Sequence, residues 1–228
     1  MGMKAVRTLW APCYRVIASR FPAIQWFEKV ANAADFQALL HFEERFDPQV
    51  RSQVGEIDLV PKEDWVFGPG ASYIMSAFTF VRAIGTRFCD GTFGVYYAAE
   101  SLETSIYETI YHNEQVLREA NIGPEDLEMQ VILSDLEADL WDVRGPKFKH
   151  LHDPDTTTYG AGQALSRQAR TDHADGIRYR SVRRPVGECV AVLSPKVLTS
   201  ARVSQHLIYP WDGHRIDPDR VCAKTLLW

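Results

Sequence analysis

The sequence predicts an α+β fold, and three observations support that class. Segments with helical spacing of apolar residues and segments with strand-like alternation both occur along the chain. They do not follow one another in the regular strand–helix repeat of a doubly wound sheet. No glycine-rich GxGxxG turn follows a predicted strand, which excludes a dinucleotide-binding fold of that kind.

The composition is that of an ordinary soluble globular protein. The 228 residues carry a formal charge of −5, and 46% of them are apolar and 24% charged. This length allows one large domain or two small ones. No linker or internal repeat divides the chain, so we expect a single domain over residues 1–228. The mild acidity argues against binding of nucleic acid through net charge alone.

The sequence favours a cytoplasmic protein without a metal. No run approaches the roughly 20 apolar residues that span a bilayer, and Arg7, Pro12 and Arg15 interrupt the N-terminal segment where a secretory signal would be apolar. The cysteines form no CxxC pair, which favours reduced thiols over a disulfide framework or a zinc site. They are Cys13, Cys89, Cys189 and Cys222. His150 and His152 have no further ligands at matching spacing, so nothing demands a metal.

The first third of the chain predicts two helices around an irregular connection. Apolar residues recur at three- and four-residue steps over Ala23–Arg45, and Pro22 precedes them at a position where proline is tolerated, so we expect a helix there. The proline-interrupted stretch 47–69 predicts irregular structure with one short strand at most. The apolar run after Gly70 predicts a short helix.

The patterns in the rest of the chain predict four strands and two helices. Strands are expected where β-branched and aromatic residues cluster or alternate with polar ones. A serine at a helix N-cap and a glutamate in the first turn mark the start of the longer helix. The expected elements are a strand over Phe93–Ala99, a helix from Ser101 to about Ala120, a strand over 129–134, a helix over Tyr159–Asp172, strands over Gly176–Ser181 and Glu188–Leu193, and a turn-rich tail over 207–220.

Two segments carry charged residues in positions that suit a binding site. Arg15 lies in the apolar run Cys13–Ile17, where its guanidinium must be paired or reach water. On its own, this arginine is more typical of an edge strand, with the guanidinium in solvent. Arg87 begins a loop that leads through a strand to a helix with Glu108 in its middle. A lone helix glutamate is usually a solvated surface residue, but Glu108 shares a polar and aromatic helix face with Tyr111.

The third segment is centred on Ser181. It leaves a strand beside basic residues and precedes a turn with proline and glycine. A hydroxyl that caps the turn explains such a serine without any catalytic role. No GxSxG elbow surrounds Ser181, so it does not resemble a serine-hydrolase nucleophile.

Together and in this order, the three segments resemble the RES-domain family, which is named for an arginine, a glutamate and a serine. The likeness runs from about Tyr14 to Arg215. Ser105, where the family commonly has alanine, and Cys89-Asp90, where asparagine or serine is usual, depart from the pattern. The matching residues are Tyr14-Arg15 in the opening YR segment, Arg87-Phe88, Gly91, Tyr97, Thr104-Ser105 and Glu108 in the central block, and Gly176-Ile177, Tyr179, Ser181, Arg183 and Gly187 in the last block.

The resemblance implies an ADP-ribosyltransferase-like mixed fold, in which helices flank a small central β-sheet. It also implies the toxin of an Xre–RES toxin–antitoxin pair, an enzyme that inhibits growth by cleaving the nicotinamide–ribose bond of NAD⁺ through hydrolysis or phosphorolysis. NAD⁺ is the substrate, and no other cofactor is implied. The expected partner is an Xre-like helix-turn-helix antitoxin, and the toxin is expected to be a homodimer within that complex. Direct contact with nucleic acid or a membrane is not expected.

The resemblance also implies roles for particular residues. Arg15, Glu108 and Ser181 would be catalytic. Arg15 and Arg87 would bind the pyrophosphate or the phosphate next to the nicotinamide ribose, and Tyr97 would line the nicotinamide pocket. Glu108 would orient the ribose hydroxyls and stabilise the transition state, and Ser181 would hold the nicotinamide ribose region or the glutamate.

The chemistry suits these residue types. Cleavage of the bond builds positive charge on the ribose, which a fixed carboxylate stabilises. Arginine forks match phosphate oxygens. The departing nicotinamide becomes neutral, so no general acid is required. Two alternatives stay open: a mono-ADP-ribosyltransferase that modifies a host protein, and a non-catalytic module that binds a nucleotide or a partner. A nuclease fits less well, because neither a basic net charge nor an acid/histidine metal cluster is visible.

Overall fold

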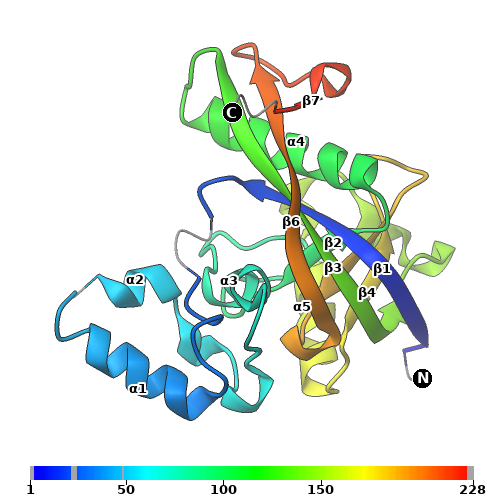
Figure 1. Ribbon diagram of the computed structural model, residues 1–228. Helices are drawn as coiled ribbons and strands as arrows, with labels where there is room; N and C mark the ends of the chain where they lie inside the picture. Colours follow the sequence, from blue (N-terminus) through cyan, green and yellow to red (C-terminus); the bar gives the residue numbers. More distant parts are fainter. Residues whose placement is uncertain (1–2, 22–24, 48, 225–228) are drawn as a thin grey trace.

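The computed structural model describes residues 3–21, 25–47 and 49–224, and it confirms the α+β class. One seven-stranded sheet has the order β1-β2-β5-β4-β3-β6-β7. Helices pack on this sheet, and Figure 1 shows the long strands β1, β3 and β6 crossing the centre of the molecule. The strands are β1 (Ala5–Ala18), β2 (Tyr96–Ala99), β3 (Glu125–Asp142), β4 (Gly176–Arg180), β5 (Glu188–Val192), β6 (Leu198–Trp211) and β7 (Cys222–Ala223).

Five α-helices are found in the described ranges, together with short 3₁₀ turns. No helix in this part of the chain combines the length and the apolar character needed to cross a membrane. The α-helices are α1 (Ala33–Glu43), α2 (Val50–Val54), α3 (Ala71–Thr79), α4 (Leu102–Glu119) and α5 (Gly160–Thr171). The 3₁₀ turns are η1 (Ile57–Leu59), η2 (Lys62–Asp64), η3 (Pro146–His152), η4 (Thr156–Thr158), η5 (Pro195–Val197) and η6 (Pro218–Arg220).

The antiparallel pair of β1 and β3 organises the sheet. Its register runs from Ala5 opposite Trp141 to Ala18 opposite Met129. Strand β1 also meets β2, where Tyr14 lies opposite Ala99, and β3 meets β4 in parallel near Leu140. Because β2 pairs with β5 and β5 with β4, the strands β1, β2, β5, β4 and β3 form a closed ring of hydrogen-bonded neighbours.

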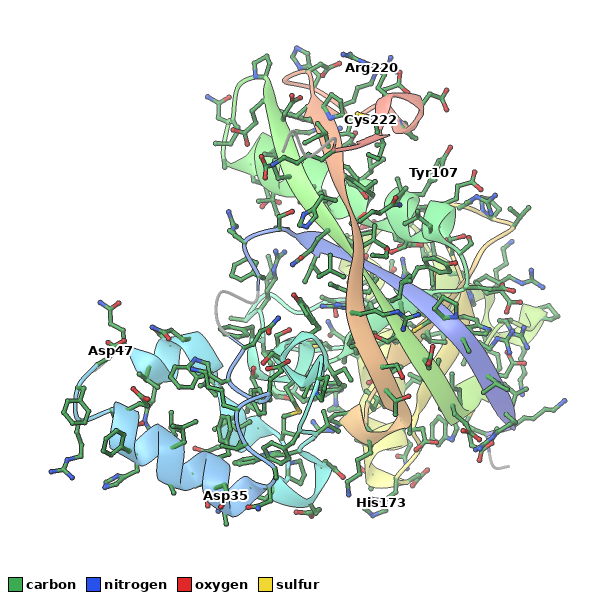
Figure 2. All side chains as sticks on the ribbon, in the orientation of Figure 1. Asp35, Asp47, Tyr107, His173, Arg220 and Cys222 are labelled. Atoms are coloured by element: carbon green, nitrogen blue, oxygen red, sulfur yellow. The ribbon has the colours of Figure 1, made fainter. Side chains whose placement is uncertain are left out.

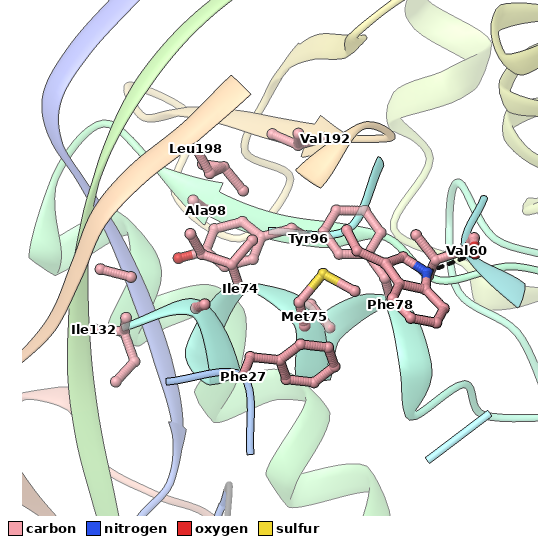
Figure 3. Close-up of a cluster of buried hydrophobic side chains, with 14 of the residues drawn as sticks. Phe27, Val60, Ile74, Met75, Phe78, Tyr96, Ala98, Ile132, Val192 and Leu198 are labelled. Atoms are coloured by element: carbon pink, nitrogen blue, oxygen red, sulfur yellow. Dashed lines mark hydrogen bonds between the residues drawn. The ribbon is translucent and has the colours of Figure 1, made fainter. Parts of the chain in front are cut away.

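Apolar side chains cover both faces of this sheet. Tyr96 and Ala98 of β2 pack with α3 on one face, where Figure 3 shows them beside Met75. Tyr97 and Ala99, which alternate with them, lie on the other face in a cluster with residues of β4 and β5. A third cluster beneath α4 joins β1, β3 and β6. The period-two alternation of a strand therefore places the two tyrosines of β2 in different environments.

The helix expected over Ala23–Arg45 is shorter than predicted. Pro22, Ala23 and Ile24 lie outside the described residues, and α1 begins only at Ala33. Asn32 caps α1, since its side chain accepts a hydrogen bond from the Asp35 amide at 2.9 Å. The preceding residues are used elsewhere: the carboxylate of Glu28 accepts the amide hydrogen of Ser72 at 2.8 Å, at the start of α3. A tertiary contact thus replaces the first turns of the predicted helix.

The structure adds detail to the expected connection and corrects the expected tail. No strand is found among the described residues of 47–69, which form α2, η1 and η2 instead. Residues 207–211, expected to be turns, are the last part of β6, and Leu207, Tyr209 and Trp211 alternate as buried side chains against β3. The other predicted helices and strands are confirmed with two changes of length. Strand β2 begins at Tyr96 and not at Phe93, and β3 is much longer than 129–134.

Helices α1 and α2 lie together to one side of the sheet, as Figure 1 shows. Asp35 and Asp47 mark this part of the chain in Figure 2, whereas Tyr107 of α4 and Arg220 of η6 lie near the opposite end. The residues predicted to form a site are on α4, on β1 and β2, and on the loops around residues 87 and 181.

Candidate active site

Helix α4 positions Glu108. Ser101 caps the helix, because its hydroxyl accepts a hydrogen bond from the Thr104 amide at 3.3 Å. Two turns later, Oε1 of Glu108 accepts hydrogen bonds from the Ser181 hydroxyl at 2.6 Å and from the Val182 amide at 3.2 Å. No hydrogen bond or ion pair to Oε2 is found among the residues that the structure describes. One oxygen of the carboxylate is therefore fixed, and the other is available to a ligand.

Ser181 is buried in a turn that directly follows β4. Its hydroxyl oxygen accepts hydrogen bonds from the amides of Arg183 at 3.2 Å and Arg184 at 2.9 Å, while its hydrogen is donated to Glu108. The turn is closed by the Ser181 amide, which donates to the carbonyl of Gly187 at 2.9 Å. Ser181 is thus both the cap of its own turn and the group that holds the glutamate.

Arg87 lies in a loop that is folded around Tyr97. The Tyr97 hydroxyl is 2.6 Å from the Thr86 hydroxyl and accepts the Phe88 amide hydrogen at 3.0 Å. These contacts fix the residues on both sides of Arg87. The guanidinium of Arg87 donates to the carbonyls of Leu151 at 2.7 Å and Asp153 at 2.9 Å.

Glu108 and Arg87 face the same buried groups. Burial raises the pKa of the Tyr179 hydroxyl well above its ordinary value, the negative charge of Glu108 raises it further, and the positive charge of Arg87 opposes the shift. The thiol of Cys189 is affected in the same way by both charges. Contacts in the fold connect the two residues as well. Arg87 donates to the carbonyl of Asp153, and Arg183 donates to the carbonyl of the next residue, Pro154. The Arg183 amide donates to the Ser181 hydroxyl that holds Glu108, so Glu108 and Arg87 belong to one site.

Arg15 is placed differently from the other predicted site residues. Its Nη1 donates to the carbonyl of Tyr97 at 3.0 Å, and its guanidinium lies 4.7 Å from the centre of the Tyr96 ring. Burial lowers the pKa of Arg15, and its Nε is buried without a partner. Among the residues that the structure describes, no hydrogen bond or ion pair joins Arg15 to Arg87, Glu108 or Ser181.

His152, one of the two histidines considered as metal ligands, has other contacts. His152 lies 3.0 Å from the carbonyl of Phe148 through Nδ1, and its Nε2 accepts the amide hydrogen of Arg180 at 3.2 Å. In residues 3–21, 25–47 and 49–224, no group of three or more histidine, cysteine or acidic side chains is arranged to hold a metal ion.

Comparison with known proteins identifies the family. A family model described as the RES domain matches residues 65–212. The chain belongs to the RES-domain family. An uncharacterized protein of Sinorhizobium fredii, y4oC, is 24% identical to it over 214 residues, which cover 89% of this chain and 84% of the relative. A chain in the crystal structure of the M. tuberculosis MbcT–MbcA toxin–antitoxin complex is similar at 10% identity and a TM-score of 0.44, over 90% of this chain and 86% of that chain.

The matched RES domain contains four of the five predicted site residues. Arg87, Tyr97, Glu108 and Ser181 lie inside it, whereas Arg15 precedes it. The RES domain of this protein nevertheless depends on the segment that carries Arg15, since β1 lies between β2 and β3 in the ring of strands.

The structure adds three residues to this RES-domain site that had no assigned role. The guanidinium carbon of Arg183 lies 3.2 Å from the centre of the Tyr111 ring, and that of Arg87 lies 4.7 Å from the centre of the Tyr159 ring. Arg183 was visible in the sequence as the arginine two positions after Ser181, and Tyr111 shares a helix face with Glu108. Tyr159 carried no signal, because only the fold brings the start of α5 beside the loop of Arg87.

Proposed function

We propose that this RES-domain protein is the toxin of a toxin–antitoxin pair and that it cleaves the nicotinamide–ribose bond of NAD⁺. The observation that carries the proposal is the state of the Glu108 carboxylate. Two hydrogen bonds from the Ser181 turn fix one of its oxygens, and the other oxygen has no partner among the described residues. A carboxylate held in this way is prepared to accept a ribose hydroxyl and to face developing positive charge.

The reaction follows from the charges of the substrate. When the bond between the ribose carbon and the nicotinamide nitrogen breaks, the electron pair leaves with nicotinamide, which becomes neutral. The ribose then resembles an oxocarbenium ion, and the nearby Glu108 carboxylate stabilises it electrostatically. Attack by water or phosphate on the ribose carbon forms the new C–O bond. Water releases one proton in this step.

The surrounding residues suit the rest of the dinucleotide. Arg87 has no carboxylate partner among the described residues, so its positive charge is available to a phosphate. Tyr97 holds the loop of Arg87 through its hydroxyl, and its ring lies in the cluster beside Tyr179. Arg15 supports the carbonyl of Tyr97 from the neighbouring strand. We propose the catalytic roles for Glu108 and Ser181 and the binding roles for Arg87 and Tyr97, with Arg15 acting through Tyr97.

The proposed partner is an Xre-like helix-turn-helix antitoxin, and the proposed assembly contains two copies of the toxin. Both proposals rest on membership of the RES-domain family. The proposed location is the cytoplasm, where the substrate and the antitoxin are both available.

The test is loss of NAD⁺ in the presence of purified protein, with and without phosphate. Glu108→Gln removes the charge and keeps the shape, and we expect it to lower the rate about a hundredfold or more. Glu119→Gln, at the exposed end of the same helix, is the matched control and should leave the rate unchanged. Appearance of nicotinamide measures bond cleavage, and a requirement for phosphate identifies phosphorolysis.

The alternatives give different results in the same assay. A mono-ADP-ribosyltransferase consumes NAD⁺ only when an acceptor protein is present and leaves ADP-ribose attached to it. A non-catalytic module binds a nucleotide or partner without releasing nicotinamide. A folded Glu108→Gln protein that consumes NAD⁺ as fast as the wild type would contradict the proposal.

A further inference from the structure

Two arginines and two tyrosines form a group beside the Glu108 carboxylate. Arg183 lies against the face of Tyr111, and Arg87 lies against the face of Tyr159. Arg87 and Arg183 lie close together, because they donate to the carbonyls of the adjacent residues Asp153 and Pro154. The positive charges of both guanidiniums also oppose the rise that burial causes in the pKa of the Tyr159 hydroxyl. The residues come from the loop before β2, from α4, from the start of α5 and from the turn after β4.

These two guanidiniums have no acidic partner in the described part of the chain. Their contacts are with backbone carbonyls: Arg87 donates to Leu151 and Asp153, and Arg183 donates to Pro154 at 2.9 Å. Other arginines of this region are paired with acids. Arg184 forms an ion pair with Glu103 at 2.5 Å, and Arg144 and Arg178 both bind Glu188.

The unused donors of Arg87 and Arg183 are not fully buried, although both residues are partly buried. Buried side-chain nitrogens without a partner do occur in the described residues, and Nε of Arg15 is one of them, but none belongs to Arg87 or Arg183. A guanidinium has five N–H donors in a planar fork. Each of these two arginines uses only one nitrogen for its carbonyl contacts, and Arg183 also has a hydrogen bond with the Tyr159 hydroxyl, so N–H donors of both forks remain for a ligand.

Two unpaired positive charges that approach one tyrosine repel each other, and an anion between them removes that cost. Stacking on aromatic rings holds each guanidinium without consuming its N–H groups. A planar fork binds phosphate oxygens with two hydrogen bonds, and two adjacent forks match two linked phosphates. The tyrosine rings therefore orient the two guanidiniums, and the N–H groups of the guanidiniums can bind a ligand.

We infer that Arg183 acts together with Arg87 as a binding site for two linked phosphates, the pyrophosphate of the dinucleotide. The identity of the dinucleotide rests on the proposed function, whereas the phosphate site rests on the geometry of the two arginines. Arg15 is not the second phosphate ligand, because it is directed to the Tyr97 carbonyl and the Tyr96 ring.

The position of Arg183 in the chain couples the phosphate site to Glu108. The hydroxyl of Ser181 accepts the amide hydrogen of Arg183 and donates to Glu108 in the same turn. The phosphate site and the residue that holds the carboxylate are consequently two positions apart on one hydrogen-bonded turn. A ligand whose phosphates bind Arg183 places its adjoining ribose at a fixed distance from Glu108.

The test measures binding of inorganic pyrophosphate and of ADP-ribose by calorimetry. It uses the full chain with Glu108→Gln, the variant expected to lower turnover about a hundredfold or more. Arg183→Gln is expected to weaken both ligands about ten- to a hundredfold, the effect of losing hydrogen bonds to a charged group. Arg183→Lys, which keeps the charge but loses the fork, should give an intermediate loss. Arg184→Gln, in the same turn but paired with Glu103, is the control and should change affinity less than twofold.

The results test the phosphate site separately from NAD⁺ cleavage. Circular dichroism and the melting temperature establish that each variant is folded. Failure of the parent protein to bind pyrophosphate, or equal binding by folded Arg183→Gln, would overturn the phosphate site. Binding that depends on Arg183 in a protein that never consumes NAD⁺ would support the phosphate site and contradict NAD⁺ cleavage. If NAD⁺ is consumed, Arg183→Gln should raise KM more than it lowers kcat.

Discussion

The hydroxyl of Ser181 connects the turn after β4 to the glutamate of α4. It accepts hydrogen bonds from two backbone amides and donates one to Oε1 of Glu108, so one side chain stabilises the turn and orients the carboxylate.

Arg15 and Arg87 show that two arginines of one chain can differ in burial and in the groups they contact. Arg15 of β1 is directed to the carbonyl of Tyr97 in β2, and burial lowers its pKa, whereas Arg87 has no fully buried nitrogen without a partner. Burial and neighbours, more than residue type, decide which arginine can bind a ligand.

Ser181→Ala is expected to lower kcat for NAD⁺ cleavage about tenfold to a hundredfold, because the carboxylate keeps only the Val182 amide as a donor. Ser181→Thr keeps the hydroxyl and should recover most of the rate. Ser204→Ala, on the exposed side of β6, is the control. Steady-state release of nicotinamide measures kcat, and wild-type turnover by Ser181→Ala would show that the hydroxyl does not position Glu108.

At the scale of elements, α4 and the Ser181 turn approach each other closely. A Cβ atom at Gly187 would lie 2.4 Å from Oγ1 of Thr104, a fully buried residue in the first turn of α4. Only glycine permits this contact. The first turn of α4 and the closing residue of the Ser181 turn are therefore in contact, which brings Glu108 within reach of Ser181.

Gly187→Ala is expected to push the turn away from α4 and to destabilise the protein by about 1–3 kcal/mol, as overpacking does in other cores. The rate of NAD⁺ cleavage should fall more than the stability loss explains, because the bond between Ser181 and Glu108 lengthens. Gly123→Ala, where a Cβ meets no atom within 4 Å, is the matched control. Urea unfolding and turnover are measured on both proteins. Equal rates would mean that the turn shifts without disturbing the carboxylate.

A group of ion pairs joins β3, β4 and β5. Arg144 binds Asp142 at 2.8 Å and Glu188 at 2.6 Å, and Arg178 binds Glu188 at 2.5 Å. The hydrogen bonds from Arg144 lower the pKa of Asp142 from 3.8 to about 2. These side chains are mostly buried, with 16% to 22% of each exposed. The ion pairs therefore connect three strands at one end of the ring.

The lowered pKa of Asp142 predicts a pH dependence of stability. The folded state binds the Asp142 proton more weakly than the unfolded chain, so the stabilisation is fully present above pH 3.8 and is lost as the pH falls toward 2. Asp142→Asn should lower the free energy of unfolding by up to about 2 kcal/mol at pH 7 and by much less at pH 2. Asp126→Asn, an exposed residue, is the control. Equal losses at both pH values would contradict the ion-pair origin.

The whole molecule depends on β1, which the RES-domain match does not include. Strand β1 pairs with β3 along most of its length and touches β2, so it closes the ring of strands. It supplies Trp10 and Cys13 to the cluster under α3 and Val16 to the cluster under α4. The part of the chain before residue 65 thus contributes to all three apolar clusters, since Met3 also packs against the cluster that holds Tyr97.

The fragment 65–212, which corresponds to the matched domain, is therefore expected not to fold alone. Without β1, an edge of β3 and the apolar side chains beneath it are exposed to water, and the core loses several large buried residues. Circular dichroism during urea titration should show a cooperative transition for the full chain and none for the fragment. A fragment that unfolds cooperatively at the same urea concentration would show that β1 is dispensable.

Local patterns were sufficient for several elements and for the candidate residues. The N-cap at Ser101 and the β-branched and aromatic residues of the strands expected over Gly176–Ser181 and Glu188–Leu193 are properties of neighbours along the chain, and the structure confirms those elements. The order of Arg87, Glu108 and Ser181 was enough to indicate the RES-domain family. The roles of these residues stay predictions.

Local patterns were misleading where distant contacts decide the structure. In β1 the register shifts between Trp10 and Cys13, so the alternation changes phase and the full strand is hidden in the sequence. In β6 the strand is defined by its pairing with β3, although the alternation of Leu207, Tyr209 and Trp211 was a usable signal. The first turns predicted for α1 were lost because Glu28 binds the start of α3.

The sequence alone determined which residues have the chemistry for this site, because residue type and order are local facts. The tertiary structure decided which of them meet. It directed Arg15 toward Tyr97, placed Ser181 against Glu108 across 73 positions of the chain, and brought Arg183 to Arg87 beside Tyr159. Such contacts depend on strand pairing, burial and the balance of charges between segments that are far apart in the chain, and none of these is visible in a run of neighbouring residues.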